Sequence, residues 1–246
     1  MHYDCHVEAS RRIAPQSVRQ YLADTDTRGA VLVQTSDGLD CLENLMHSLD
    51  CVPSARGVAR LMGGEDRGDF SAMAARGVRG ACIDVARNDK ALDLMERVEH
   101  LHDALPRTWH IELRLTCQAA AAAAALLARV DRIFCLVLRD GQAGMDSGHG
   151  AALGWWLDMG NAYLKLAACG AKSLGGTCLA QLAQGVPERV LLGSGWPLSQ
   201  STCSWPKALD AVHEQASKNA QRVYQFDSDQ PTRLRLRAGA IKRTHH

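Results

Sequence analysis

Short apolar runs alternate with helix-like stretches along most of the chain, and this alternation constrains the fold more than any other feature. The runs are Tyr3–Val7, Ala30–Gln34, Gly57–Leu61, Val78–Val85, Trp109–Leu115, Ile133–Leu138, Ala162–Ala167 and Val190–Gly193. The stretches between them are typical of amphipathic helices, for example Cys41–Leu49, Lys90–Leu105, Gln118–Val130 and Gly150–Met159. Alternating strands and helices predict right-handed βαβ units and a parallel sheet.

Eight such units predict an α/β protein with one domain, a (β/α)8 TIM barrel, and the length of 246 residues fits this fold. The alternative is an open, doubly wound sheet, but no Gly-x-Gly-x-x-Gly turn follows the first strand. We expect the barrel to occupy residues 1–229 and a basic tail to follow at residues 230–246. The tail is either an edge strand or a disordered arm, and it is a candidate contact with a second copy or another protein.

The composition is that of an ordinary globular protein. Hydrophobic residues make up 46% of the chain, charged residues make up 22%, and the formal net charge is +1. We therefore expect neither nucleic acid nor a membrane as a partner, and no apolar run approaches the roughly 20 residues that a membrane span needs. The N-terminus has no signal-peptide pattern. The nine cysteines include no Cys-x-x-Cys pair, which favours free structural thiols and a cytoplasmic protein.

Polar side chains at the strand ends are the candidates for chemistry, because barrels carry their active sites at the carboxyl ends of the strands. These side chains are His6, Glu8, Gln34, Asp84, Arg87, Arg114, Arg139, Asp140, Lys165 and Ser194. The basic ones predict a site for a small anion, because guanidinium groups bind carboxylates through two parallel hydrogen bonds. We expect Arg87, Arg114, Arg139 and Lys165, with Ser194, to bind the carboxylated or phosphorylated substrate. For each basic residue, a surface or structural role is the alternative.

His6 and Glu8 form the sharpest local pattern. They are two residues apart on a strand and so share a face, and they predict an acid–base couple in which the carboxylate raises the pKa of the imidazole. Asp84 and Asp140 are further carboxylates placed to act as a base. A divalent metal at His6 and Glu8 is the alternative, but a zinc site needs about three or four ligands. We expect no cofactor.

Two other residues near these strands are expected to stay out of the chemistry. Cys5 precedes His6, and adjacent strand residues point to opposite faces, so the sequence does not predict a Cys–His couple. His110 stands at the start of a strand. It is therefore expected at the end of the barrel opposite the active site.

Several segments, in this order, resemble the amidohydrolase superfamily, in particular the branch of the 2-pyrone-4,6-dicarboxylate lactonases. The segments are Tyr3–Glu8, Ala30–Gln34, Gly77–Asp84, Trp109–Leu113, Tyr163–Leu166, Pro187–Pro197 and Asn219–Phe226. The first is similar to an Asp-x-His-x-His strand. The sixth is similar to the end of the last barrel strand, where the family has an aspartate before Trp-Pro as general base or metal ligand. The resemblance implies a TIM barrel and a lactonase-type or amidase-type hydrolase.

The chain departs from the family pattern where the chemistry is expected. Glu8 stands in place of the second histidine, Arg139 in place of a histidine after the sixth strand, Gly195 in place of the aspartate, and Leu198 in place of a later histidine. Only His6 is retained from that set. Two hypotheses follow: a metal-independent, lactonase-type hydrolase in which His6 and Glu8 perform acid–base work, or a catalytically degenerate barrel that serves as a scaffold or regulatory subunit.

Overall fold

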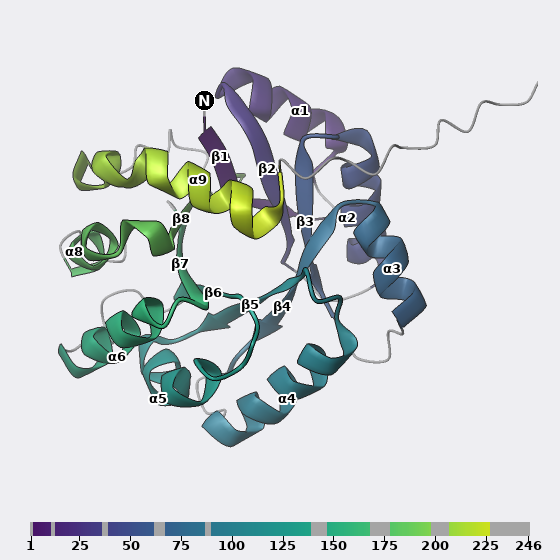
Figure 1. Ribbon diagram of the computed structural model, residues 1–246. Coiled ribbons are helices and arrows are strands. Elements are labelled where there is room, and N and C mark those ends of the chain that lie inside the picture. Colours follow the sequence, from purple (N-terminus) through teal and green to yellow (C-terminus); the bar gives the residue numbers. More distant parts are fainter. Residues whose placement is uncertain are drawn as a thin grey trace, which may run out of the picture.

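Each of the eight predicted runs forms a strand in the computed structural model, and the strands make a parallel, nearly closed barrel (Figure 1). The structure describes residues 2–10, 13–35, 39–61, 67–86, 90–138, 147–167, 178–197 and 207–226. The strands are β1 (His2–Ala9), β2 (Thr27–Gln34), β3 (Ala55–Arg60), β4 (Val78–Asp84), β5 (His110–Leu115), β6 (Phe134–Leu138), β7 (Ala162–Ala167) and β8 (Val190–Gly193). Their order in the sheet is their order in the chain. The predicted TIM barrel is confirmed, and the open doubly wound sheet is wrong.

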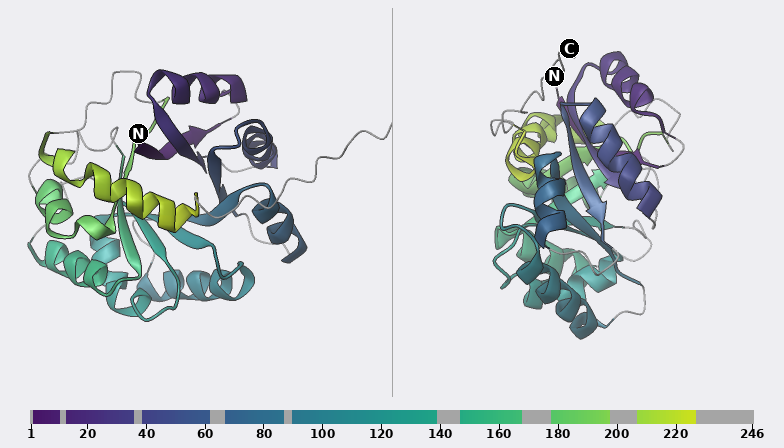
Figure 2. Two further views of the ribbon diagram at one scale, coloured as in Figure 1. Left: turned by 45° about the horizontal axis from the view of Figure 1, so that its top comes forward. Right: turned by 90° about the vertical axis from the view of Figure 1, so that its right-hand side faces the viewer.

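Helices surround the strands (Figures 1 and 2). They are α1 (Pro15–Asp24), α2 (Leu39–Cys51), α3 (Arg67–Ala75), α4 (Ala91–Ala104), α5 (Cys117–Leu127), α6 (Ser147–Asp158), α8 (Cys178–Gly185) and α9 (His213–Tyr224), with the short 3-10 helices η2 (Pro187–Arg189) and η3 (Lys207–Val212). The alanine-rich α5 has an N-cap, because the Thr116 hydroxyl accepts a hydrogen bond from Ala119 N at 3.1 Å. No described helix combines the length and the apolar character that crossing a bilayer requires.

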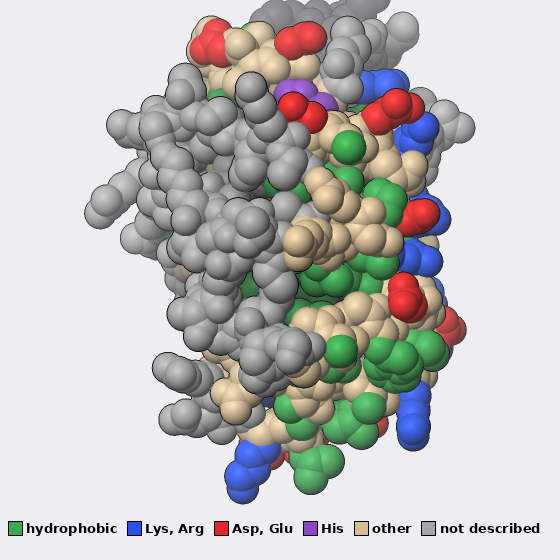
Figure 3. Space-filling view, turned by 90° about the vertical axis from the view of Figure 1, so that its left-hand side faces the viewer, with side chains coloured by type: hydrophobic (Ala, Val, Ile, Leu, Met, Phe, Trp, Pro, Cys, Tyr) green, Lys and Arg blue, Asp and Glu red, His purple; other side chains and the backbone are tan. Residues whose placement is uncertain are grey.

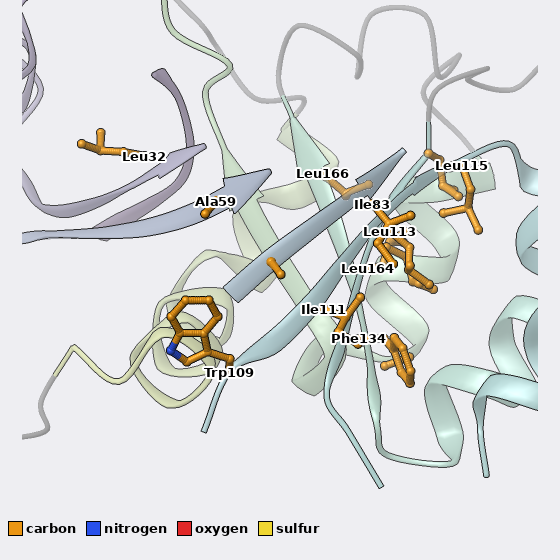
Figure 4. Close-up of a cluster of buried hydrophobic side chains, with 14 of the residues drawn as sticks. Leu32, Ala59, Ile83, Trp109, Ile111, Leu113, Leu115, Phe134, Leu164 and Leu166 are labelled. Atoms are coloured by element: carbon orange, nitrogen blue, oxygen red, sulfur yellow. The ribbon is translucent and has the colours of Figure 1, made fainter. Parts of the chain in front are cut away.

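Strand β5 shows how the sequence fills both sides of the barrel wall. Ile111, Leu113 and Leu115 belong to the hydrophobic cluster between strands and helices (Figure 4), whereas the alternate residues point inward. All residues of β5 are buried, because helices cover one face and the other strands cover the opposite one. A second cluster fills the interior; among its members are Tyr3, Cys5, Val33, Val58, Cys82, Cys135, Tyr163 and Leu191.

The end of the barrel at which the strands begin is closed by α9, which crosses it in Figure 1. The buried ring of Tyr224 lies edge-on to His110, with centroids 5.0 Å apart. Gln225 Nε2 donates to Thr108 O at 2.7 Å, and Asn219 Nδ2 donates to Val190 O at 2.9 Å. The prediction that His110 lies away from the carboxyl ends of the strands is confirmed. A ligand site is therefore left to the opposite end.

Strands β1 and β8 complete the ring through backbone hydrogen bonds. Gly195 N donates to His6 O at 2.8 Å, and Glu8 N donates to Trp196 O at 2.8 Å. Gly193 lies so close to β1 that a Cβ atom there would stand 2.4 Å from His6 Cβ. Gly195 has a φ of +71°, in the left-handed region that favours glycine. The glycines at the end of β8 thus allow the last strand to meet the first.

The described cysteines agree with the prediction of free thiols. Cys5, Cys41, Cys82, Cys117 and Cys135 are buried and free, and Cys51 is free and half-buried. Burial raises the pKa of the Cys5 thiol to about 12, so that thiol is protonated and unreactive at neutral pH. These cysteines are packing residues.

Figure 3 shows the side of the molecule that is on the left in Figure 1, and hydrophobic side chains gather over the lower part of that side. Trp155 on α6 is 47% exposed, and Met159, which directly follows α6, is 52% exposed. The predicted tail at residues 230–246 lies outside the described residues, so the domain boundary at residue 229 stays a prediction.

Candidate functional site

A column of polar side chains runs up the inner face of β5. His110, Glu112 and Arg114 alternate with apolar residues and therefore share the face that points into the barrel. His110 lies at the closed end, Glu112 in the middle, and Arg114 toward the open end. Asp84 at the end of β4 pairs in register with Arg114. The column thus leads from the packed base of the barrel to the carboxyl ends of the strands.

Glu112 is the centre of a buried ion-pair network. Its Oε2 lies 2.7 Å from Lys165 Nζ, and both side chains are fully buried. Its Oε1 lies 3.4 Å from Arg114 Nε. Burial by itself raises the pKa of Glu112, but the charges of Lys165 and Arg114 outweigh it and lower that pKa to about 2. The carboxylate is therefore ionised at neutral pH and neutralised from two sides.

His6 faces the interior because β1 is irregular. Asp4 pairs with Ala30 and Val7 with Leu32, so three steps along β1 match two steps along β2 and the alternation shifts. Cys5 belongs to the interior cluster, whereas Val7 belongs to the outer one. Gly193 shares the inner face of β8 with Leu191 of the interior cluster. A Cβ atom at Gly193 would stand 2.4 Å from His6 Cβ, which puts His6 on the inner side as well. The prediction that Cys5 and His6 face opposite sides is therefore wrong.

The His6 imidazole is buried and neutral. Burial, followed by the charge of Lys165, lowers its pKa to about 3. The prediction that Glu8 raises the pKa of His6 is therefore wrong. In the described part of the chain, His6 Nδ1 has no hydrogen-bond partner. At neutral pH this ring can donate or accept a hydrogen bond, but it holds no proton to give as an imidazolium.

A second ion pair lies nearer the rim. Arg60 at the end of β3 pairs with Asp84 at the end of β4, and their side chains are 23% and 16% exposed. Arg60 N also donates to Gln34 Oε1 at 3.1 Å, and Arg114 Nη2 donates to Gln34 O at 3.5 Å. Arg60, Asp84, Gln34 and Arg114 therefore form one polar rim over β2 to β5.

Among the described carboxylates near the open end, Glu8 stands apart from these pairs. It is half-buried, and burial raises its pKa, while the charge of Arg114 acts in the opposite direction. Its side chain forms no hydrogen bond or ion pair with any described residue. Asp84 and Glu112, in contrast, are each paired with a cation.

Asp4 and Ser194 belong to the junction between β1 and β8. Asp4 Oδ1 accepts hydrogen bonds from His6 N at 3.0 Å and from Ser194 N at 2.8 Å. Asp4 Oδ2 accepts one from Tyr21 OH at 2.5 Å. The Ser194 hydroxyl accepts a hydrogen bond from Trp196 N at 2.9 Å. This buried carboxylate thus joins the backbone of β1 at His6 to the backbone that follows β8 at Ser194. A contact between Ser194 and the substrate stays a prediction.

The structure brings five of the predicted site residues to the carboxyl end of the strands: His6, Glu8, Asp84, Arg114 and Ser194. Lys165 lies deeper in the barrel, where its Nζ is 2.7 Å from Glu112 Oε2. Arg87, Arg139 and Asp140 lie outside the described residues. Sequence reasoning missed Glu112, Arg60 and Asp4. Glu112 could have been found, because it stands two residues before Arg114 on a strand and so shares its face. Arg60 ends a strand in the same way as the residues that were selected.

No protein-family model and no curated protein matches this sequence, but solved structures share its fold. A protein from Pseudomonas putida assigned as a 2-pyrone-4,6-dicarboxylic acid hydrolase superposes with a TM-score of 0.69 at 21% identity, over 93% of this chain and 98% of that one. A protein from Acinetobacter baumannii with the same assignment, solved with citric acid bound, gives 0.65 at 17% identity, over 91% and 99%. An amidohydrolase from Burkholderia multivorans with bound zinc gives 0.61 at 16% identity, over 90% and 92%. The chain therefore has the barrel fold of these proteins.

The zinc in one of these structures raises the question of whether the present residues fit a metal. In the ranges that the structure describes, no three His, Cys, Asp or Glu side chains gather as a possible metal site. Lys165 and Arg114 also place two positive charges where they act on His6. The described side chains around His6 and Glu8 do not fit a divalent cation.

Proposed function

We propose that this protein is a hydrolase that opens a lactone or related ester in a small carboxylated molecule, bound at the carboxyl end of the barrel. Its fold is shared with proteins assigned as 2-pyrone-4,6-dicarboxylic acid hydrolases. One of those was solved with citric acid, a small polycarboxylate, bound. Both observations support a carboxylated substrate. The charged residues at the rim of this barrel support the proposal that the substrate binds there.

The observation that carries the proposal is the orientation of Arg114. Its Nε points to Glu112, and one Nη2 donor points to Gln34 O. In the described part of the chain Nη1 has no acceptor, and the side chain is 10% exposed. The outer edge of the guanidinium is therefore available to a carboxylate, which this group binds through two parallel hydrogen bonds. Arg87, Arg139 and Ser194 are proposed as further contacts.

Glu8 acts as the general base in this proposal, because it forms no ion pair with a described residue, whereas Asp84 and Glu112 do. Glu8 removes a proton from a water molecule as that water attacks the carbonyl carbon. The ring C–O bond then breaks, and the proton passes from Glu8 to the leaving oxygen. The neutral His6 imidazole supplies a hydrogen bond to the substrate. Neither Asp84 nor Lys165 transfers a proton, because each is held in an ion pair.

The test measures the turnover of 2-pyrone-4,6-dicarboxylate, which is monitored through the loss of its ultraviolet absorbance. Glu8→Gln should lower kcat roughly 10²–10⁴-fold with little change in KM. Arg114→Ala should raise KM instead. Glu43→Gln, on the exposed face of α2, is the matched control and should behave as the wild type. If Glu8→Gln retains the wild-type kcat, Glu8 is not the base.

A second candidate is a catalytically degenerate barrel that acts as a scaffold or regulatory subunit. The observation in its favour is that Gly195 offers no side chain at the end of β8, while the inner charges neutralise one another. Native mass spectrometry of protein purified without chelator separates the candidates. A bound organic acid supports the hydrolase, and a bare stable oligomer without turnover supports the scaffold. The free cysteines support a cytoplasmic location for either one.

A further inference from the structure

The ion pair between Glu112 and Lys165 has a geometry that bears on Arg114. Lys165 Nζ holds Glu112 Oε2 at 2.7 Å, so the carboxylate cannot turn away from β7 without losing that contact. The other oxygen, Oε1, is then directed at Arg114 Nε, 3.4 Å away. Both Glu112 and Lys165 are fully buried, so water does not replace either contact.

The interior leaves room for this arrangement. In register, Glu112 of β5 pairs with Cys135 of β6, and Cys135 pairs with Tyr163 of β7. The small Cys135 side chain at this height lets Lys165 reach from β7 across β6 to Glu112. The charges of both residues act on the Cys135 thiol, which agrees with their position beside it.

Stability alone does not account for charges at this place. Removing an ammonium and a carboxylate from water costs free energy, and apolar residues of similar volume often stabilise a protein as well or better. The pair stands beneath the Arg114 guanidinium, whose outer edge is presented to the open end. A role in orienting that guanidinium gives the buried charges a function.

We propose that Glu112, fixed by Lys165, is a positioning residue that holds the Arg114 guanidinium in the orientation that receives a substrate carboxylate. The inference rests on the proposed function of Arg114, and it adds that the affinity for the carboxylate depends on a buried pair that never touches the substrate. Lys165 is thereby assigned to the support of the site, and not to the ring of anion-binding residues that the sequence predicted.

Two double variants test this inference without leaving a lone buried charge. Glu112→Leu/Lys165→Met removes the pair and the acceptor for Arg114 Nε. Glu112→Gln/Lys165→Met removes the ion pair but keeps a side-chain oxygen that Arg114 can still reach. Two quantities are measured for each: the kinetics with 2-pyrone-4,6-dicarboxylate and the Arg114 Nε–H resonance in nitrogen-15 NMR spectra. That resonance is assigned through its absence in Arg114→Lys.

The expected result is a rise in KM of roughly 10- to 100-fold for Glu112→Leu/Lys165→Met with kcat nearly unchanged, together with loss of the Arg114 resonance through exchange with water. Glu112→Gln/Lys165→Met should have a KM closer to that of the wild type and should retain much of the Arg114 resonance. Wild-type KM and an unchanged resonance in both variants would overturn the positioning role. If the wild type turns over no substrate, the proposed function fails, but the resonance still decides whether Glu112 orders Arg114.

Discussion

Two ion pairs in the same barrel differ mainly in depth. Glu112 and Lys165 meet in the interior with both side chains fully buried, whereas Arg60 and Asp84 meet at the rim, 23% and 16% exposed. Water can replace either partner at the rim but neither partner inside. The deep pair is therefore suited to fixing geometry, and the rim pair is suited to exchanging partners when a ligand arrives. Whether an ion pair fixes geometry or can exchange partners therefore depends on the depth of its residues in the barrel, and not on their type.

Breaking the deep pair from one side should give the largest effect. Glu112→Leu leaves Lys165 charged and without its carboxylate in the interior, so the free energy of unfolding should fall by about 3–5 kcal/mol. Urea unfolding measures it. Glu112→Leu/Lys165→Met should lose much less, because no unpaired charge remains. Equal losses in the single and the double variant would show that packing, and not charge, dominates at this depth.

The pH dependence of the free energy of unfolding should distinguish the deep pair from the rim pair. The pKa of Glu112 is lowered from 4.5 to about 2 in the folded protein, so its contribution is present above pH 4.5 and is lost as the pH falls from 4.5 toward 2. Urea unfolding across this range should show that loss in the wild type and in Asp84→Asn. In Glu112→Leu/Lys165→Met the loss should be smaller.

The buried histidines affect the free energy of unfolding at a higher pH than Glu112 does. The pKa of His6 is lowered from 6.5 to about 3, and that of His110 from 6.5 to about 4. Both stay neutral when folded but bind a proton when unfolded, so stability falls as the pH drops below 6.5. His110→Phe keeps a ring against Tyr224 and should reduce the fall between pH 6.5 and 4. An identical pH profile would mean that His110 gains access to water before global unfolding.

Breaking the rim pair should cost little stability. Asp84→Asn removes one partner of Arg60 in a place that solvent reaches, and the expected loss is within about 1 kcal/mol. Turnover should survive in this variant, because Glu8 is the proposed base. Loss of turnover in Asp84→Asn with normal folding would transfer that role to Asp84.

The smallest effect is expected from the basic tail, because the sequence predicts that it lies outside the barrel. Deleting residues 230–246 should leave the free energy of unfolding of the barrel within about 0.5 kcal/mol of the wild type, as for surface changes away from the core. Light scattering of the same variant tests the scaffold hypothesis. Weaker association would support a tail that contacts a second copy or a partner, and unchanged association would count against it.

The local patterns predicted most of the architecture. The alternation of apolar runs and helical stretches predicted all eight strands, because periodicity along a strand or helix depends only on neighbouring residues. The same rule could have placed Glu112 beside Arg114 on β5. It failed at β1, where one extra residue between Asp4 and Val7 shifts the alternation. Such an irregularity depends on the pairing with β2, and the residues of β1 alone do not predict it.

The sequence by itself therefore determined the fold class, the free cysteines of the core, and the set of polar residues at the strand ends. Tertiary structure decided which of those residues meet. Lys165 of β7 reaches Glu112 of β5 across β6, and Arg60 of β3 reaches Asp84 of β4. Those contacts depend on the strand register and the curvature of the closed barrel, which are properties of residues far apart in the chain. Depth in the barrel then fixed the charge states of His6 and Glu112, because burial and neighbouring charges shift the pKa of each group away from its ordinary value.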